Sequence, residues 1–152
     1  MNANVTNLVI SSNSCDDLNS LLLNECRYLK SIVIGDGCCN SVNTFIIDGF
    51  KSLRLLKIGK NAFNVGLPFD YSGYGMYSSP PNEFCIVNCP KLESIDIDEY
   101  SFVNFEYFRL SKLPKLKSIR IASFGSVVPS SRGLSFEIKS IIDMILLMNR
   151  SS

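Results

Sequence analysis

A 24-residue spacing in the apolar pattern constrains the fold of this chain more than any other feature. One aliphatic triplet occurs five times, and its central member stands at positions 8, 32, 56, 95 and 119. A 24-residue step separates neighbouring copies everywhere except between the third and the fourth, where the step is 39. Self-similarity at such a period is typical of repeat architectures, in which each repeat packs only on its neighbours. The five copies are Val5, Leu8, Ile10; Leu29, Ile32, Ile34; Leu53, Leu56, Ile58; Leu92, Ile95, Ile97; and Leu116, Ile119, Ile121.

A second apolar series follows the first in every repeat and reads FxIxxL in its clearest copies. Both series alternate with period two, which places their apolar residues on one face of an extended strand. Each 24-residue unit, called a rung below, is therefore expected to hold two short strands and no helix. The copies of this series are Leu21, Leu23, Cys26; Phe45, Ile47, Phe50; Phe84, Ile86, Cys89; Phe108, Leu110, Leu113; and Phe136, Ile138, Ile141.

The first series resembles the leucine-rich repeat, whose strand signature LxxLxL is matched by LKSIVIG, LRLLKIG, LESIDID and LKSIRIA. With a Phe a few residues past the strand, as in Phe63 and Phe102, the chain is most similar to the BspA-like subclass. The resemblance runs from Val5 to Ile141 and implies a mainly β solenoid of five to six rungs, with a parallel concave sheet and short convex strands. Helix, if any, is expected only at the C-terminus. In many leucine-rich repeats an Asn forms a buried ladder, and here only Asn13 and Asn61 match it.

Composition narrows the class of protein. At 152 residues and 46% apolar content, residues 1–152 are expected to form a single domain. Fifteen basic and fourteen acidic residues give a net charge of +1, which argues against nucleic acid or anionic membrane as a partner. No apolar run is long enough for membrane insertion. The chain shows no signal peptide, so it is expected in the cytoplasm as written, or at the cell surface if it is a fragment of a longer protein.

Catalysis is not expected. The sequence has no histidine, which removes the commonest general base and catalytic metal ligand. The carboxylates Asp96 and Asp98 fall on outward strand positions, where acids are ordinarily solvated. The CIVNC segment, with Cys85 and Cys89, lacks a second ligand pair with zinc-like spacing. We therefore expect no enzyme activity, no cofactor and no metal site.

Six cysteines raise the question of disulfides, and their place in the repeat favours thiols instead. Cys15 and Cys39 take the Phe position of the repeat, while Cys26 and Cys89 take its last Leu position, so these four are predicted to be small core residues. A disulfide between Cys15 and Cys39 on adjacent rungs is the alternative. The remaining two, Cys38 and Cys85, fall between inward positions and are predicted to face solvent. The glycines after two strands, Gly35 and Gly59, suit a turn that needs a permissive backbone.

The 39-residue step contains an insertion of fifteen residues between Phe63 and Phe84. The inserted stretch, residues 66–81, reads GLPFDYSGYGMYSSPP and combines aromatic residues with Gly, Ser and Pro, as paratopes do. Insertions in repeat proteins map to loops that often lie on the binding face. A flexible surface loop is the equally weighted alternative. The residues predicted to bind a partner in this loop are Phe69, Tyr71, Tyr74, Met76 and Tyr77.

The outward strand positions offer a second candidate surface. The central ladder is apolar at one end and charged at the other, and it reads Val9, Val33, Lys57, Asp96, Arg120. From this surface Leu55, Lys57, Asp96 and Arg120 are predicted to bind a partner, although the charged members could simply pair across neighbouring strands. A further apolar stripe on the convex side is predicted from Leu22, Ile46, Cys85 and Val87.

Taken together, the residues favour a non-catalytic scaffold that binds a protein of unknown identity, and the resemblance implies adhesion. The alternative is a structural fragment of a larger repeat array that self-associates through open end rungs. Residues 142–152 are expected to start a sixth rung with Met144 and Leu147, or to fold as a capping helix.

Overall fold

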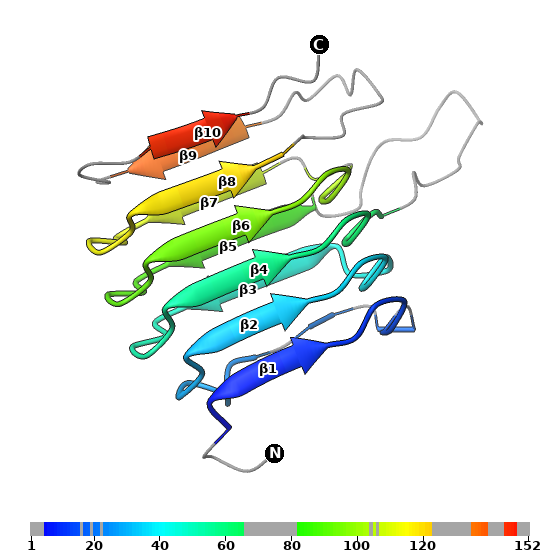
Figure 1. Ribbon diagram of the computed structural model, residues 1–152, viewed down its shortest axis with the longest axis horizontal. Coiled ribbons are helices and arrows are strands. Elements are labelled where there is room, and N and C mark those ends of the chain that lie inside the picture. Colours follow the sequence, from blue (N-terminus) through cyan, green and yellow to red (C-terminus); the bar gives the residue numbers. More distant parts are fainter. Residues whose placement is uncertain are drawn as a thin grey trace, which may run out of the picture.

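The computed structural model describes residues 5–15, 17–18, 20–21, 23–65, 82–103, 105, 107–122, 135–139 and 145–148 (Figure 1). Within these ranges the chain forms ten strands and no helix. The predicted mainly β class is therefore confirmed. The strands are β1 (Asn7–Ile10), β2 (Ser31–Ile34), β3 (Thr44–Asp48), β4 (Leu55–Ile58), β5 (Glu83–Val87), β6 (Ser94–Ile97), β7 (Tyr107–Ser111), β8 (Ser118–Ile121), β9 (Ser135–Lys139) and β10 (Ile145–Met148).

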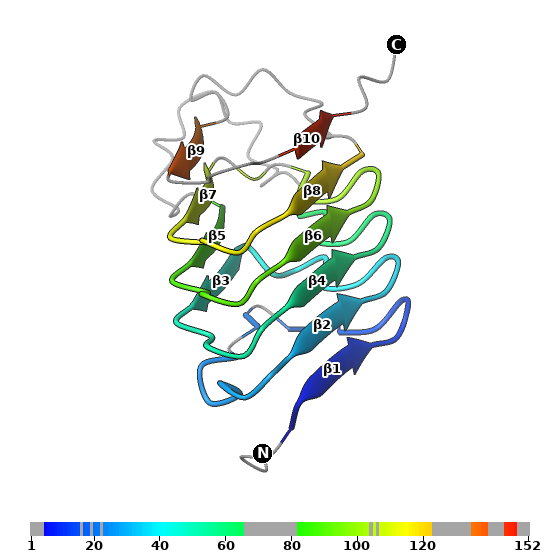
Figure 2. The ribbon, with the colours of Figure 1, turned by 60° about the vertical axis from the view of Figure 1, so that its left-hand side comes forward.

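The strands form two sheets, and every pairing in both of them is parallel. One sheet has six strands in the order β1-β2-β4-β6-β8-β10, and the other has four in the order β3-β5-β7-β9. After β2 the chain alternates between the two sheets, so neighbours within a sheet come from successive rungs. The sheets lie opposite each other as two layers (Figure 2), and the apolar core contains residues from both.

The register of the six-stranded sheet follows the sequence repeat. Ile32 pairs with Leu56, Leu56 with Ile95, and Ile95 with Ile119, while the Ile34 to Ile121 ladder runs two positions further on. Members of both ladders are at most 2% exposed. The predicted inward positions of these strands are confirmed, because a parallel ladder with a period-two pattern buries one face of each strand.

Six phenylalanine rings join the two layers. Phe45, Phe84 and Phe108 pair in register on the four-stranded sheet, and the rings of Phe84 and Phe108 stack with centroids 4.3 Å apart. Phe63 and Phe102, from the turns after β4 and β6, stack at 4.7 Å, and Phe63 lies 5.0 Å from Phe45. The sixth ring, Phe105, meets that of Phe102 edge-on. Such contacts add to the free energy of burying the rings.

The turns after the strands use left-handed backbone at repeated positions. Asn13, Gly37, Asn61 and Tyr100 are equivalent in the repeat and have φ between 52° and 63°. Asn13 and Asn61 are exposed, so they do not form a buried ladder. Asn and Gly suit these positions because they tolerate positive φ better than other residues. Cys15, Cys39, Phe63 and Phe102, two residues further on, also have positive φ, as do Gly49, Asn88 and Lys112 after the strands of the four-stranded sheet.

The reason predicted for Gly35 and Gly59 is wrong. Neither has positive φ; what each position lacks is room for a side chain. A Cβ on Gly35 would lie 2.6 Å from the backbone nitrogen of Ser12, and one on Gly59 would lie 2.7 Å from that of Asp36. Successive turns therefore approach each other too closely at these two positions for any larger residue.

Two predictions about cysteines are also wrong. Cys38 is fully buried and Cys85 is 6% exposed, although both were expected to face solvent. The turn before Cys38 ends the period-two alternation, and the Cys38 thiol donates to the Ser11 carbonyl oxygen at 2.9 Å. Cys85 is short and lies between the longer side chains of Ile46 and Arg109 on the neighbouring strands. All six cysteines are thiols, as favoured over a disulfide, and Cys15 and Cys26 are only partly buried.

The first and last rungs depart from the predicted pattern. Residues 20–21 and 23 are not in a strand. The first strand formed by the second series is therefore β3, and the copy that starts at Leu21 forms none among its described residues. At the other end, residues 145–148 form β10 and not a capping helix. The predicted register of β10 was one residue off: Leu147 was expected at the repeat position of Ile119, but Leu146 pairs with Ile119 and Leu147 pairs with Arg120. Met144 lies outside the described residues. The last step of the sheet is longer than the 24-residue repeat, which the spacing of the earlier copies does not reveal.

Candidate interaction surface

The six-stranded sheet has one face turned away from the four-stranded sheet, which we call the outer face. On β1, β2, β4, β6 and β8 it consists of the ladder from Val9 to Arg120 and of a mainly polar ladder beside it. The polar ladder is linked in places by side chains: the Ser31 hydroxyl donates to Asn7 Oδ1 at 2.7 Å, and that of Ser118 donates to Ser94 Oγ at 3.2 Å. Its members in strand order are Asn7, Ser31, Leu55, Ser94 and Ser118.

On β4, β6 and β8 the outer face carries charge. Arg120 Nη2 lies 2.6 Å from Asp96 Oδ1, an ion pair between adjacent strands. That carboxylate oxygen is enclosed but receives no hydrogen bond of good geometry, so the contact is mainly Coulombic. Lys57 pairs in register with Asp96 on the other side but makes no ion pair among the described residues. Lys57 is exposed.

The other end of the outer face is apolar. Val9 is 68% exposed, and it pairs in register with Val33, which is half-buried. Leu55, also half-buried, lies one strand further along in the neighbouring ladder. Among the exposed large apolar side chains of the described residues, Val9 shows the greatest exposed fraction. An apolar surface of this kind is a candidate for contact with another molecule.

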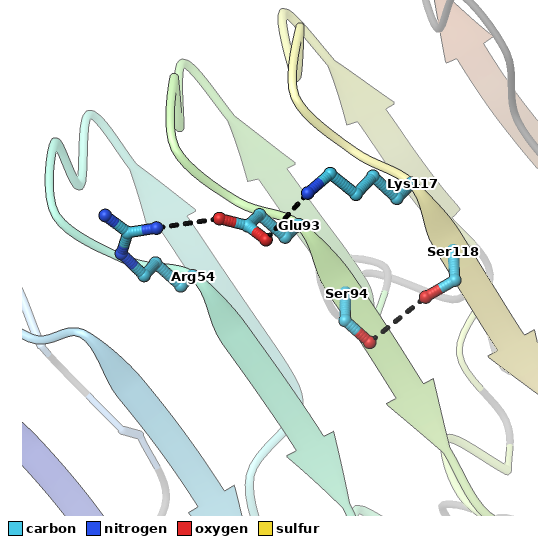
Figure 3. A network of polar contacts seen from close by, with 5 residues as sticks. All are labelled: Arg54, Glu93, Ser94, Lys117 and Ser118. Atoms are coloured by element: carbon cyan, nitrogen blue, oxygen red, sulfur yellow. Dashed lines mark hydrogen bonds and ion pairs between the residues drawn. The ribbon is translucent and has the colours of Figure 1, made fainter.

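A second charged network lies where the strands of the six-stranded sheet begin (Figure 3). Glu93 accepts from Arg54 at 2.7 Å and from Lys117 at 3.1 Å, so one carboxylate joins three adjacent strands. The hydrogen bond and charge of Lys117, followed by those of Arg54, lower the pKa of Glu93. At the opposite ends of these strands Lys60 pairs with Glu99 at 3.0 Å, which raises the pKa of Lys60. Water reaches all these groups and screens them, so each pair stabilises the fold only weakly.

The predicted partner-binding residues divide into two groups. Leu55, Lys57, Asp96 and Arg120 lie together on the outer face, in three strands of which each pairs with the next. The five residues of the 66–81 loop lie outside the described residues. Of the predicted convex stripe, Ile46 pairs in register with Cys85 on the four-stranded sheet and Val87 lies two residues past Cys85, but Cys85 is buried rather than exposed. Leu22, also assigned to that stripe, is outside the described residues.

Sequence reasoning missed the network around Glu93. Its signal was present, since Lys30, Arg54, Glu93 and Lys117 occupy the same position of the repeat, directly before each strand. Alternating charge at one repeat position predicts ion pairs between adjacent rungs. The row lies directly before each strand, outside the strand positions that predict the outer face.

Within the described ranges there is no group of three or more His, Cys, Asp or Glu that could hold a metal ion. A search of the same residues found no helix long and apolar enough to cross a membrane. What the outer face offers is a set of hydroxyls, an apolar patch and three charges on a rigid sheet.

Comparison with known proteins adds no family to this description. No protein-family model matches the chain, and the comparisons with curated proteins and with solved structures found no similar chain.

Proposed function

We propose that this protein is a non-catalytic scaffold that binds another protein through the outer face of the six-stranded sheet. The observation that carries the proposal is the apolar patch of the exposed Val9 and the half-buried Val33 and Leu55, continuous with the charges of Lys57, Asp96 and Arg120. Protein interfaces combine an apolar centre with a polar rim in this way. The rigid parallel sheet holds these side chains in place before any partner arrives, which lowers the entropic cost of binding.

The architecture we propose is a leucine-rich-repeat solenoid, most similar to the BspA-like subclass. Strand partners separated by 24 or 39 residues, in step with the sequence repeat, support this assignment. So does the LxxLxI pattern of β2, β4, β6 and β8 and of the residues that precede them. Adhesion at a cell surface is the function that the resemblance implies, and it depends on the same outer face.

The test is capture of a partner by wild-type protein and by matched variants. Val9→Ser combined with Val33→Ser removes the apolar patch, while Ile46→Ser, on the four-stranded sheet, removes an exposed apolar residue elsewhere. Captured proteins are quantified by mass spectrometry after the fold of each variant has been checked by circular dichroism. A partner lost with the double variant and kept with Ile46→Ser is the expected result. Equal capture by all forms would contradict the outer face as the binding site.

A further inference from the structure

The net charge of +1 conceals a separation of charge between two edges of the molecule. The connections that lead into β2, β4, β6 and β8 are the equivalent stretches 24–30, 48–54, 87–93 and 111–117. They contain eight basic and three acidic residues, and all eight basic side chains are exposed. We call this the basic edge, which lies at the left of Figure 1. Its basic residues are Arg27, Lys30, Lys51, Arg54, Lys91, Lys112, Lys115 and Lys117.

The opposite edge has the opposite sign. In the connections that leave β1, β2, β4 and β6, the described residues include four acidic side chains and one basic one. The basic residue, Lys60, is paired with one of the four, Glu99. The others are Asp17, Asp36 and Asp98. Charge therefore changes sign from one end of the strands to the other, a separation that the summed charge of the chain does not reveal.

The basic edge is a regular array because the backbone beneath it is regular. The amide of Arg54 donates to the Lys30 carbonyl at 2.8 Å, that of Glu93 to Arg54 at 2.9 Å, and that of Lys117 to Glu93 at 2.9 Å. Charged residues thus recur once per strand, about 4.8 Å apart. Within this row Glu93 neutralises part of the charge, by its pairs with Arg54 and Lys117. Lys51, Lys91 and Lys115, in the turns, take part in none of the ion pairs found among the described residues.

The neighbouring surface indicates which polyanion fits. The basic edge continues directly into the apolar end of the outer face, since Lys30 precedes β2, which holds Val33, and Arg54 precedes Leu55. Tyr28, on the basic edge itself, is 60% exposed. Nucleic-acid backbones and sulfated glycans offer no apolar group to Val33, Val9 or Leu55. An acidic polypeptide segment with interspersed apolar residues complements both surfaces together.

We propose that the basic edge binds an acidic segment of a polypeptide, whose apolar residues contact the adjoining end of the outer face. This inference rests on the proposed protein-binding function and specifies the chemistry of the partner. Charge complementarity at the edge speeds association of the partner and orients it, and the apolar contact with Val9 and Val33 slows its dissociation. Binding is consequently sensitive to salt, because all the basic groups are exposed.

The experiment measures binding of a synthetic peptide of repeated Glu-Glu-Leu, about ten residues long, enough to span four strands when extended. A single-stranded oligonucleotide of equal charge and heparin serve as comparison ligands. The edge variant is the triple Lys51→Gln, Lys91→Gln, Lys115→Gln. Its matched control is Ser11→Asp, Asn43→Asp, Asn64→Asp, which lowers the net charge equally at exposed sites on the opposite edge.

The edge variant is expected to bind the peptide at least about tenfold more weakly than wild type, while the control stays within about twofold. Raising the salt concentration to about 1 M should abolish wild-type binding. Equal weakening in both variants, absence of peptide binding, or tighter binding of the oligonucleotide or heparin would overturn the proposal. The Val9→Ser, Val33→Ser variant separates the two ideas: if it loses its captured partner while the edge variant keeps it, the outer face stands and the acidic-segment proposal fails.

Discussion

At the scale of single residues, backbone conformation explains which residue types occupy the turn positions better than burial does. Lys112 has φ of 55°, whereas the equivalent residues after β3 and β5 are Gly49 and Asn88. Glycine and asparagine tolerate a left-handed backbone, whereas lysine tolerates it less well. The strain at Lys112 is therefore a cost that this rung carries and the other two avoid.

Replacing Lys112 with glycine should raise the free energy of unfolding by about 1 kcal/mol. The left-handed conformation costs a residue with a Cβ about 1–2 kcal/mol, of which the greater flexibility of unfolded glycine cancels part. The control is Lys115→Gly, at an exposed turn position without positive φ. The free energy of unfolding of this variant should fall by up to about 1 kcal/mol. Urea unfolding of the three proteins measures both effects. Destabilisation by Lys112→Gly equal to that of the control would contradict the backbone argument.

Thiol reactivity follows burial in the fold. Cys15 and Cys26 are partly exposed and should label first, while Cys38, Cys39 and Cys85 should label slowly. Cys89 should be slow for a second reason, since burial raises the pKa of its thiol to about 11 and the thiolate is the reactive form. Mass spectrometry after timed labelling resolves the six sites. Cys89 labelling in the folded protein should go on accelerating with pH up to about 11, and early labelling of Cys38 or Cys85 would contradict their observed burial.

At the scale of strands, the register could be predicted because its cause lies in the sequence. A period-two pattern buries one face of a strand, and a slip by one residue would expose every isoleucine of β2, β4, β6 and β8. The same reasoning failed at Cys38 and Gly35, where the chain has left β2. Cys38 lies beyond a turn, and Gly35 depends on the approach of Ser12 from another rung, which no local pattern encodes.

The register can be tested with adjacent pairs of substitutions. Ile34→Asp and Ile58→Asp each place a carboxylate at a fully buried position, whereas Val33→Asp and Lys57→Asp place it on the outer face. A buried unpaired carboxylate costs several kcal/mol, comparable to the roughly 5–15 kcal/mol that stabilises a domain. The first pair should lose the cooperative thermal transition in circular dichroism, and the second pair should keep it. Similar melting of adjacent variants would show that the sheet is paired differently.

At the scale of the whole molecule, the sequence predicted which residues lie on the outer face better than it predicted how charge is distributed between the two edges. The ladder containing Lys57, Asp96 and Arg120 was predicted because every second residue of a strand faces the same side of the sheet. The basic edge was not, since its residues are distributed over four connections and are brought to one side only by parallel pairing. Net charge averages over both edges, so a chain with separated charges looks neutral when it is read as a sequence.

Removing fifteen residues within residues 66–81 should leave both sheets intact. Paired positions of β4 and β6 are 39 residues apart, whereas those of β2 and β4 are 24 residues apart. The deletion therefore gives β4 and β6 the common 24-residue spacing. The flanking rungs already meet outside the inserted stretch: the Glu83 amide donates to the Asn43 carbonyl at 2.9 Å, and that of Phe102 donates to Ala62 at 3.0 Å. Because closure entropy changes slowly with loop length, a shift in the free energy of unfolding of no more than about 1 kcal/mol is expected.

Thermal melting of the deleted protein checks the fold, and partner capture checks the role predicted for Phe69, Tyr71, Tyr74, Met76 and Tyr77. A preserved melt with an unchanged set of captured proteins would place recognition on the outer face and the basic edge. A preserved melt with lost capture would show that the aromatic residues of the insertion are needed as well. Loss of the cooperative melt would contradict the prediction, because the inserted residues would then contribute to the core and not only to binding.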